Sequence, residues 1–376
     1  MSEKGILLQD IKAENESYSD DALFNITSFG TDMTFRELIM MYDEGDLEKP
    51  ELQRKYVWTK NEASRFIDSI LLGLPVPSIF LAKTSDEKRL IVDGYQRIMT
   101  VYDFVNGIFS ADCKIFKLSN SGNININWRG KAFKELTNDE QRKIRNSSIH
   151  AIVFEQKYPQ SDTGMYQIFE RINTSGKILK PQEIRNCVYN GSFNNLLMNL
   201  NKHSLWRKVL DSQKEDSRMS DVELILRFFA ISFIKENEEI NQKQINLTKY
   251  LNEFMGRNSN IDSNQAAKYT NYFITVLTYL HKTIGNELFR NIKEKDGTLS
   301  YTKRINPVIF DAVSAATLYK IINNITCDDK LKRRYTELLK NPDFKQAISI
   351  RTTNIDSIKS RISTAAKILY GIEYEW

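Results

Sequence analysis

The spacing of apolar residues changes near residue 190, and this change constrains the fold more than any other feature. Before it, apolar runs of strand length, such as residues 79–82 and 90–92, alternate with capped amphipathic helices. After it, apolar residues recur with a helical period to the end of the chain, as in residues 307–322, without a convincing strand pattern. We therefore predict an α+β N-terminal domain followed by an all-helical C-terminal domain.

Length and composition favour two folded domains. The chain has 376 residues, of which 41% are hydrophobic, and this excludes global disorder. We expect a flexible N-terminal arm over residues 1–22, an α+β domain over 23–190 and a helical domain over 191–376. The three cysteines lie far apart, the N-terminus lacks an apolar signal segment, and no apolar stretch is long enough for a membrane helix. These features predict a soluble cytoplasmic protein.

Basic residues gather near the C-terminus. The whole chain has a net charge of +5, whereas residues 330–367 alone contain ten basic and three acidic residues. Such an asymmetry favours a surface that binds a polyanion, and the alternative is a solvated helix face. If the polyanion is DNA, the candidate contacts are Lys332, Arg333, Arg334, Arg351, Lys359 and Arg361.

Several common catalytic motifs are absent from the sequence. It contains no GxxxxGK[ST] P-loop, no GxGxxG fingerprint and no GxSxG elbow. The three histidines, His150, His203 and His281, have neither the spacing of a metalloprotease nor that of an HNH nuclease. We expect them to be structural or surface residues, and we predict no zinc site.

The sharpest chemical feature is the segment Asp93-Gly94-Tyr95-Gln96-Arg97, which follows an apolar strand and opens an amphipathic helix. At such a junction the first N–H groups of the helix and the positive end of its dipole converge, which suits a phosphate. Gly94 allows close approach, and Arg97 could bind phosphate oxygens. Asp93 could hold a metal, orient a water or cap the helix. The structural alternative is Asp93 as the N-cap, with Arg97 in a local ion pair.

Two further segments combine basic and polar groups. Gln53 and Arg54 precede a capped helix and lie close to Trp58, a mixture suited to phosphates and bases, although an aromatic anchor for the helix explains Trp58 equally well. Arg171 and Asn173 lie at the end of a predicted helix. Short polar side chains at such a turn could bind a ligand or simply cap the helix.

Together, the segments QRKYVW, SILLGLPVPSIFLA, VDGYQR and FERINTSGKILKPQEIRN resemble, in order and spacing, the GmrSD-type restriction-effector family, whose hallmark is a DGQQR box. The stretch from Asp221 to Phe229 is similar to the helical half of that family. The resemblance covers about residues 25–235, with weaker agreement to the end. It implies a ParB/sulfiredoxin-like N-terminal fold, with a small mixed sheet and helices, and a role in bacterial antiphage defence against foreign, often modified, DNA.

The resemblance also implies a site that binds and hydrolyses a nucleoside triphosphate. Whether Mg²⁺ serves as a cofactor is left open. By that analogy, the residues in hydrolysis are Asp93, Gln96 and Arg97. The residues around the phosphates are Gln53, Arg54, Asp93, Gly94, Tyr95, Arg97, Arg171 and Asn173. The arginines would neutralise charge that spreads over the phosphate oxygens in the transition state.

The sequence departs from the family pattern in two ways. Tyr95 stands where the box commonly has Gln, which puts hydrolysis in more doubt than binding. An HNH-type nuclease pattern, which such proteins often carry or pair with, is missing. The first hypothesis is therefore a nucleotide-hydrolysing regulator of restriction with its nuclease in a partner subunit. The second is a non-enzymatic DNA-binding or assembly module, and the third is a self-contained DNA-nicking enzyme. A homo-oligomer is also left open.

Overall fold

We analysed a computed structural model of the chain. It describes residues 25–48, 58–84, 87–158, 163–172, 180–216, 218–234, 243–295, 298–326 and 330–376. The chain divides into two compact units, one containing residues 22–179 and 186–188, the other containing residues 180–185 and 189–376. The division falls within one helix, α6 (Pro181–Val188). Among the described residues, no helix is both long and apolar enough to cross a membrane.

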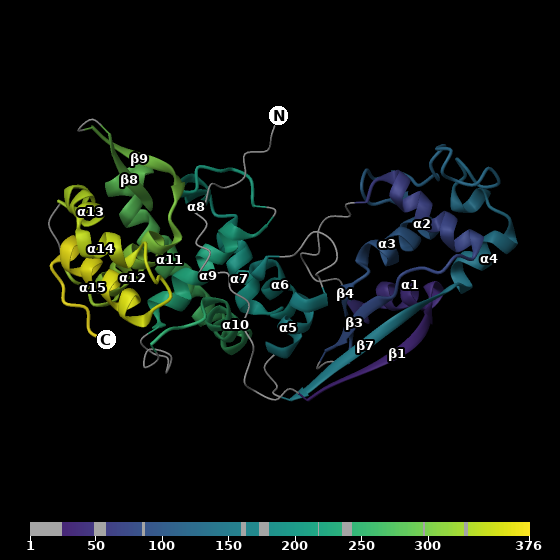
Figure 1. The fold of residues 1–376 in the computed structure, drawn as a ribbon, viewed down its shortest axis with the longest axis horizontal. Coiled ribbons are helices and arrows are strands. Elements are labelled where there is room, and N and C mark those ends of the chain that lie inside the picture. Colours follow the sequence, from purple (N-terminus) through teal and green to yellow (C-terminus); the bar gives the residue numbers. More distant parts are fainter. Residues whose placement is uncertain are drawn as a thin grey trace. The chain divides into compact units, whose positions relative to one another are not determined.

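The first unit is built on a mixed sheet. Its strands are β1 (Asn25–Thr34), β2 (Leu47–Glu48), β3 (Ile79–Lys83), β4 (Arg89–Asp93) and β7 (Ser148–Tyr158), in the order β1-β7-β3-β4-β2. β1 with β7 and β3 with β4 pair antiparallel, whereas β3 with β7 and β2 with β4 pair parallel. The short strands β5 (Ile108–Phe109) and β6 (Lys114–Ile115) form a separate pair. The small mixed sheet predicted for this part of the chain is therefore present (Figure 1).

The helices of this unit begin and end where the sequence provides caps. They are α1 (Phe35–Glu44), α2 (Lys60–Leu72), α3 (Tyr95–Asn106), α4 (Asn138–Asn146) and α5 (Thr163–Ile172). Before α2, the Thr59 side chain accepts a hydrogen bond from the Glu62 N–H, while the Glu62 carboxylate accepts one from the Thr59 N–H at 2.7 Å. Gly73 ends the same helix at φ 76°, a region that favours glycine. These local signals confirm the capped helix that the sequence predicts after Gln53 and Arg54.

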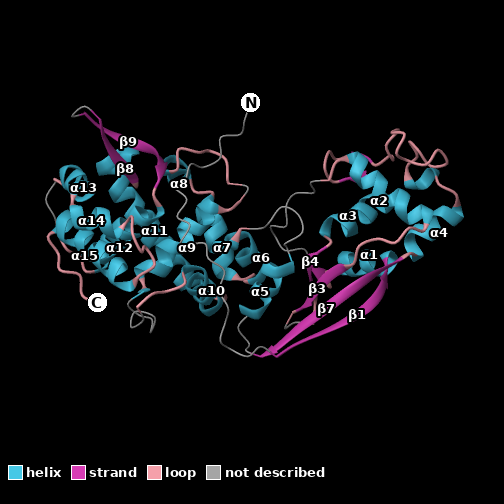
Figure 2. Ribbon diagram, viewed as in Figure 1, coloured by secondary structure: helices cyan, strands magenta, loops and turns pink. Residues whose placement is uncertain are grey.

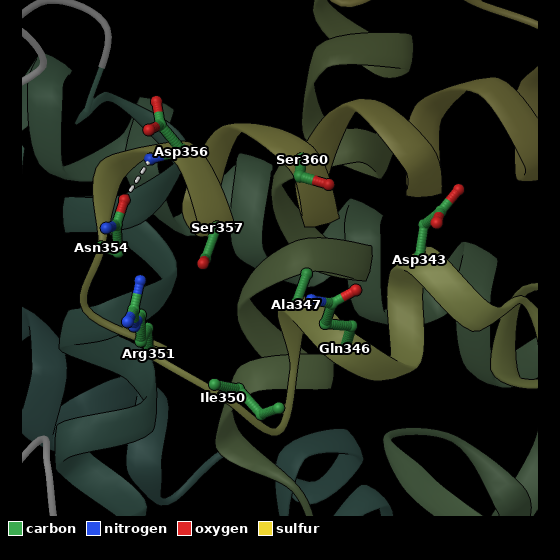
Figure 3. A pocket seen from close by; sticks show the side chains of 9 residues that line it. All are labelled: Asp343, Gln346, Ala347, Ile350, Arg351, Asn354, Asp356, Ser357 and Ser360. Atoms are coloured by element: carbon green, nitrogen blue, oxygen red, sulfur yellow. Dashed lines mark hydrogen bonds between the residues drawn. The ribbon is translucent and has the colours of Figure 1, made fainter.

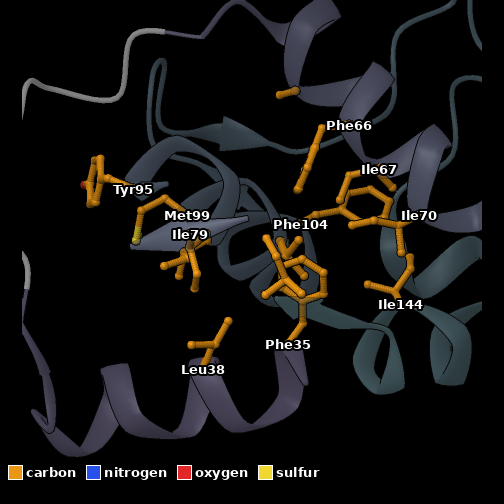
Figure 4. Packing of buried hydrophobic residues seen from close by; sticks show 14 of the residues in the cluster. Phe35, Leu38, Phe66, Ile67, Ile70, Ile79, Tyr95, Met99, Phe104 and Ile144 are labelled. Carbon is orange, nitrogen blue, oxygen red and sulfur yellow. The ribbon is translucent and has the colours of Figure 1, made fainter. Parts of the chain in front are cut away.

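A hydrophobic core joins the helices to the sheet. Phe35 of α1, Ile67 of α2, Phe104 of α3 and Ile144 of α4 are buried side chains of one cluster, together with Ile79 of β3 (Figure 4). Because successive side chains of a strand point to opposite faces, alternate sheet residues such as Leu81, Ile91 and Val153 also enter this core. The core thus fixes the end of β4 and the start of α3 relative to each other.

The second unit is mainly helical (Figure 2). Its helices are α6, α7 (Ser192–Asn201), α8 (Ser204–Val209), α9 (Ser220–Ser232), α10 (Leu247–Asn258), α11 (Ser263–Ile284), α12 (Pro307–Ile322), α13 (Leu331–Lys340), α14 (Pro342–Ala347) and α15 (Ile355–Tyr370). α12 lies at its centre, because every residue from Pro307 to Leu318 is buried. Such a helix shows no polar face, since other elements surround it.

The prediction of an all-helical C-terminal part is wrong. β8 (Arg290–Lys295) and β9 (Thr298–Ile305) form an antiparallel hairpin between α11 and α12. The apolar pattern did not indicate these strands, because much of the hairpin is exposed and buries little apolar surface. The dipeptide Asp296-Gly297 between them is a strong hairpin signal that apolar periodicity does not reveal.

Candidate functional site

The junction between β4 and α3 has the geometry that the sequence predicted. β4 ends at Asp93, α3 begins at Tyr95, and Gly94 lies between them at φ 99°. A Cβ atom on Gly94 would lie 2.3 Å from Cγ2 of Ile79, which is too close for any side chain. Glycine is therefore required by its backbone conformation and by the approach of β3, independently of any ligand.

Arg97 is held by two partners within the junction. Its Nη1 donates to Oδ2 of Asp93 at 3.1 Å and to the carbonyl oxygen of Ser78 at 2.9 Å. The Arg97 side chain is 20% exposed and that of Asp93 is 42% exposed, so the pair lies at the surface. The local ion pair of the structural alternative is thus present. Asp93 does not serve as the N-cap, because Gly94 occupies that position and no side-chain cap hydrogen bond forms there.

Gln96 connects the junction to the segment before α2. Its Oε1 accepts a hydrogen bond from the Trp58 N–H at 3.3 Å. The Trp58 ring packs edge-on against Phe66 of α2, with 5.6 Å between the ring centroids, so Trp58 is an anchor for that helix. The predicted site residues Gln53 and Arg54 lie outside the described residues.

The side chain of Tyr95 lies in the hydrophobic core and is 7% exposed. Figure 4 shows its ring beside Met99 of the next helical turn. Burial raises the pKa of the Tyr95 phenol to about 12, and the nearby charge of Asp103 adds to this increase. The side chain therefore stays neutral and packs as an aromatic residue, and any contact of Tyr95 with a phosphate would have to come from its backbone.

Arg171 lies in the last turn of α5 and is exposed. Within the described part of the chain, no hydrogen bond or ion pair joins it to Asp93 or Arg97. Asn173 lies outside the described residues. The structure therefore places Asp93, Gly94, Gln96 and Arg97 together at one junction, and it does not connect Arg171 with them.

A buried polar network that the sequence pattern did not indicate surrounds Arg185 of α6. Arg185 is 1% exposed. Its Nη2 donates to Oε2 of Glu223 at 2.6 Å, its Nη1 to Oδ1 of Asn252 at 3.3 Å, and its Nε to Oε1 of Gln182 at 2.9 Å. A guanidinium with these three partners joins α6, α9 and α10 and is a structural group of the helical unit.

Arg361, predicted to bind DNA, is buried, and this prediction is wrong. Its side chain is 1% exposed and lies 3.8 Å from Oδ2 of Asp311 on α12. It also donates to the carbonyl oxygen of Thr352. The helical period placed Arg361 on α15 correctly, but it could not show that this face of the helix packs against α12.

The other basic residues of this region remain at least partly accessible, and several have neighbours. Lys332 lies 3.3 Å from Glu287 and Arg333 lies 2.8 Å from Glu337. Arg334 donates to the carbonyl oxygen of Leu369, and the Lys359 ammonium lies over the Trp376 ring. Part of the positive charge counted in the sequence is therefore neutralised locally.

Arg351 is exposed and lines a cavity of about 650 Å³ between α14 and the start of α15 (Figure 3). Asn354 caps α15 by accepting a hydrogen bond from the Asp356 N–H at 2.9 Å. The lining combines one arginine with the carboxylates of Asp343 and Asp356, a composition that does not select an anion. The cavity belongs to the helical unit, whereas Gly94 belongs to the other unit. Among the described residues, no group of three or more His, Cys, Asp or Glu side chains could hold a metal ion.

The first unit is thus an α+β domain with a strand–glycine–helix junction at its surface. Residues 35–190 match the family described as the GmrSD restriction endonuclease, N-terminal domain. This match confirms, for residues 35–190, the resemblance to the N-terminal domain of the GmrSD type that the four sequence segments indicate. Comparisons with curated proteins and with solved structures gave no match.

Proposed function

We propose that the protein is an antiphage restriction component that binds and hydrolyses a nucleoside triphosphate and thereby regulates the cleavage of foreign, including modified, DNA by a partner nuclease. The supporting observation is that the segment from Asp93 to Arg97 forms a surface junction of strand and helix inside the part of the chain that matches the restriction family. We also assign this domain to the ParB/sulfiredoxin-like folds.

In this proposal the triphosphate lies against the first turn of α3, where backbone N–H groups and the helix dipole attract negative charge. The Arg97 guanidinium, which Asp93 and the Ser78 carbonyl hold beside the junction, turns toward the phosphate oxygens and stabilises the charge that develops on them. Asp93 then orients the attacking water. If Mg²⁺ accompanies the triphosphate, the partly exposed carboxylate of Asp93 would be the protein group to hold it.

Phosphate release from each nucleoside triphosphate tests the proposal. Arg97→Ala should reduce turnover by roughly a hundredfold or more, since one group that stabilises transition-state charge typically contributes that much. Arg142→Ala removes an exposed arginine of α4 and should leave turnover unchanged. Asp93→Asn removes the same ion pair but keeps the guanidinium, and it should also lose turnover because the carboxylate that orients the water is gone. The absence of turnover by the wild-type protein, with DNA and a candidate nuclease present, would sink the proposal.

The second candidate is a DNA-binding module without hydrolysis. The net positive charge of residues 330–367 and the exposure of Lys332, Arg333 and Arg351 favour it. It predicts binding of duplex DNA whose affinity falls steeply with salt, because each neutralised phosphate releases counterions. DNA binding without any phosphate release would favour this candidate over the first.

A further inference from the structure

The β8–β9 hairpin is anchored firmly at its base. The Asn306 N–H donates to the Phe289 carbonyl oxygen at 2.8 Å, and the Phe289 N–H donates to Oη of the buried Tyr335 at 2.8 Å. Ile305, the last residue of β9, is 1% exposed. Beyond this base the hairpin extends past the neighbouring helices of its unit in the view of Figure 1. It is a two-stranded ribbon on a rigid base.

The strand register gives the ribbon an inner and an outer face. Ile292 pairs with Tyr301, whose hydroxyl lies 3.3 Å from Oγ1 of Thr336 on α13, so this face is directed toward α13. The next pair, Lys293 with Ser300, lies on the opposite face because successive strand residues alternate. Lys293 and Ser300 are exposed, as is Thr298 two residues before Ser300. The outer face therefore presents a cation and hydroxyl groups to solvent.

The ribbon is basic, and its cations differ in their surroundings. Residues 290–305 contain five basic and two acidic residues. Arg290 stabilises the base of the hairpin, because its guanidinium donates hydrogen bonds to the carbonyl oxygens of Asn286 and Leu288. Lys293, Lys303 and Arg304 are exposed, and no carboxylate whose side chain the structure describes forms an ion pair with them. These three residues are called the ribbon cations below.

We propose that the β8–β9 ribbon enters the major groove of duplex DNA, with the ribbon cations on phosphates and with Thr298 and Ser300 directed to the base edges. The major groove of B-form DNA is about 12 Å wide and admits a two-stranded ribbon, and serine and threonine can hydrogen-bond to base edges there. The deep, narrow major groove of an RNA duplex does not admit one. The inference rests on the DNA binding proposed above and adds the element that makes the contact.

The test measures the affinity of the full-length protein for a short fluorescent DNA duplex over a range of salt concentrations. The variant Lys293→Gln/Lys303→Gln/Arg304→Gln removes the ribbon cations. The control Lys202→Gln/Lys208→Gln/Lys282→Gln removes the same charge from exposed positions of the same unit, at the C-cap of α7 and on α8 and α11. We expect the ribbon variant to bind roughly tenfold or more weakly, with a salt slope shallower by about 2 to 3, because about three phosphate contacts are lost. The control should retain the slope of the wild-type protein.

Four results would overturn the inference. Equal losses in the two variants would mean that net charge alone attracts DNA. Equal affinity of the wild-type protein for RNA and DNA duplexes of one sequence would contradict entry into the major groove. A third contrary result is normal DNA binding by the ribbon variant together with weaker DNA binding by Lys332→Gln/Arg333→Gln/Arg351→Gln. It would place the DNA at those three residues instead of at the ribbon, and it would leave the proposed function intact. If the wild-type protein binds no DNA, the inference and the DNA part of the proposed function fail together.

Discussion

At the scale of single residues, the junction between β4 and α3 shows what the fold alone requires of Gly94 and Arg97. Gly94 is required because the chain turns there in the left-handed region and because Ile79 leaves no room for a Cβ atom. Arg97 is already partnered by Asp93 and by a backbone carbonyl. A ligand at this junction must therefore compete with an existing ion pair, which makes Asp93 the residue whose neutralisation should release Arg97.

Substitution of Gly94 by alanine should destabilise the protein strongly. The left-handed backbone conformation and the overlap with Ile79 together should cost about 2–5 kcal/mol. Gly107, at the other end of α3, has φ 86°, but a Cβ atom added there would meet nothing within 4 Å, so Gly107→Ala should cost only about 1–2 kcal/mol. Urea unfolding of both variants measures the difference. Equal losses would show that the contact with Ile79 relaxes without cost.

Asp103 should make stability depend on pH. Its side chain is 3% exposed and accepts hydrogen bonds from the N–H and hydroxyl of Ser110, both at 2.7 Å. Burial raises the pKa of this carboxyl above its ordinary value of 3.8, although the Ser110 hydrogen bonds oppose the increase. The folded state thus holds the proton more tightly than the unfolded state, so this residue's contribution to stability falls as pH rises through the folded pKa.

Asp103→Asn should consequently be more stable than the wild-type protein at pH 7, because a neutral amide can keep the contacts with Ser110 without a buried charge. The difference should shrink as the pH is lowered toward 3.8, where the wild-type carboxyl becomes protonated in both states. Thermal unfolding of the two proteins between neutral and acidic pH provides the measurement. A difference that stays constant with pH would show that Asp103 is not the titrating group.

At the scale of elements, packing determines what a charged residue does. Arg361 and Arg351 both belong to the basic C-terminal stretch. Arg361 lies on α15 and is buried against α12, whereas Arg351 is exposed in the loop before α15. Asp311 of α12 pairs with Arg227 of α9 as well as with Arg361. These buried charges connect three helices, so they belong to the stability of the unit.

Arg361→Gln should therefore lower the free energy of unfolding by about 3 kcal/mol, the low end of the range for breaking a buried ion pair, since Asp311 keeps Arg227. Arg351→Gln should change stability by less than about 0.5 kcal/mol, as expected for an exposed side chain. Chemical denaturation gives both values. Similar stabilities of the two variants would contradict the burial of Arg361.

At the scale of the whole molecule, the chain has two units with separate interiors. The core of the first lies among α1, α2, α3, α4 and the sheet, and that of the second surrounds α12. Since each unit buries its own apolar side chains, the stability of each unit against local unfolding should depend mainly on contacts within that unit. A substitution in one core should thus leave the local stability of the other nearly unchanged.

Ile67→Ala tests this independence. Ile67 is fully buried in α2, and truncation of such a side chain costs about 2–5 kcal/mol. Hydrogen exchange followed by mass spectrometry should show faster exchange in α2, α3 and β3, with α9, α12 and α15 unchanged. The reciprocal variant Leu226→Ala, at a fully buried position of α9, should give the opposite pattern. Faster exchange throughout the chain in either variant would mean that the units unfold together.

The sequence by itself determined the features that depend on neighbouring residues. The capped helix after Arg54 and the strand–glycine–helix junction were both predicted, because their hydrogen bonds and backbone angles involve residues only a few positions apart. Only the tertiary structure decided the order of the sheet, the contact of Arg97 with the Ser78 carbonyl, the partner of Gln96, and the burial of Arg361. These depend on contacts between distant residues, such as Asp311 with Arg361 and Trp58 with Gln96, which residue spacing does not encode. The ribbon of β8 and β9 is different, because its two strands are neighbours in the sequence and the Asp296-Gly297 hairpin signal lies between them. Apolar periodicity does not predict it, because its strands leave much of their length exposed and lack the apolar alternation of a half-buried strand.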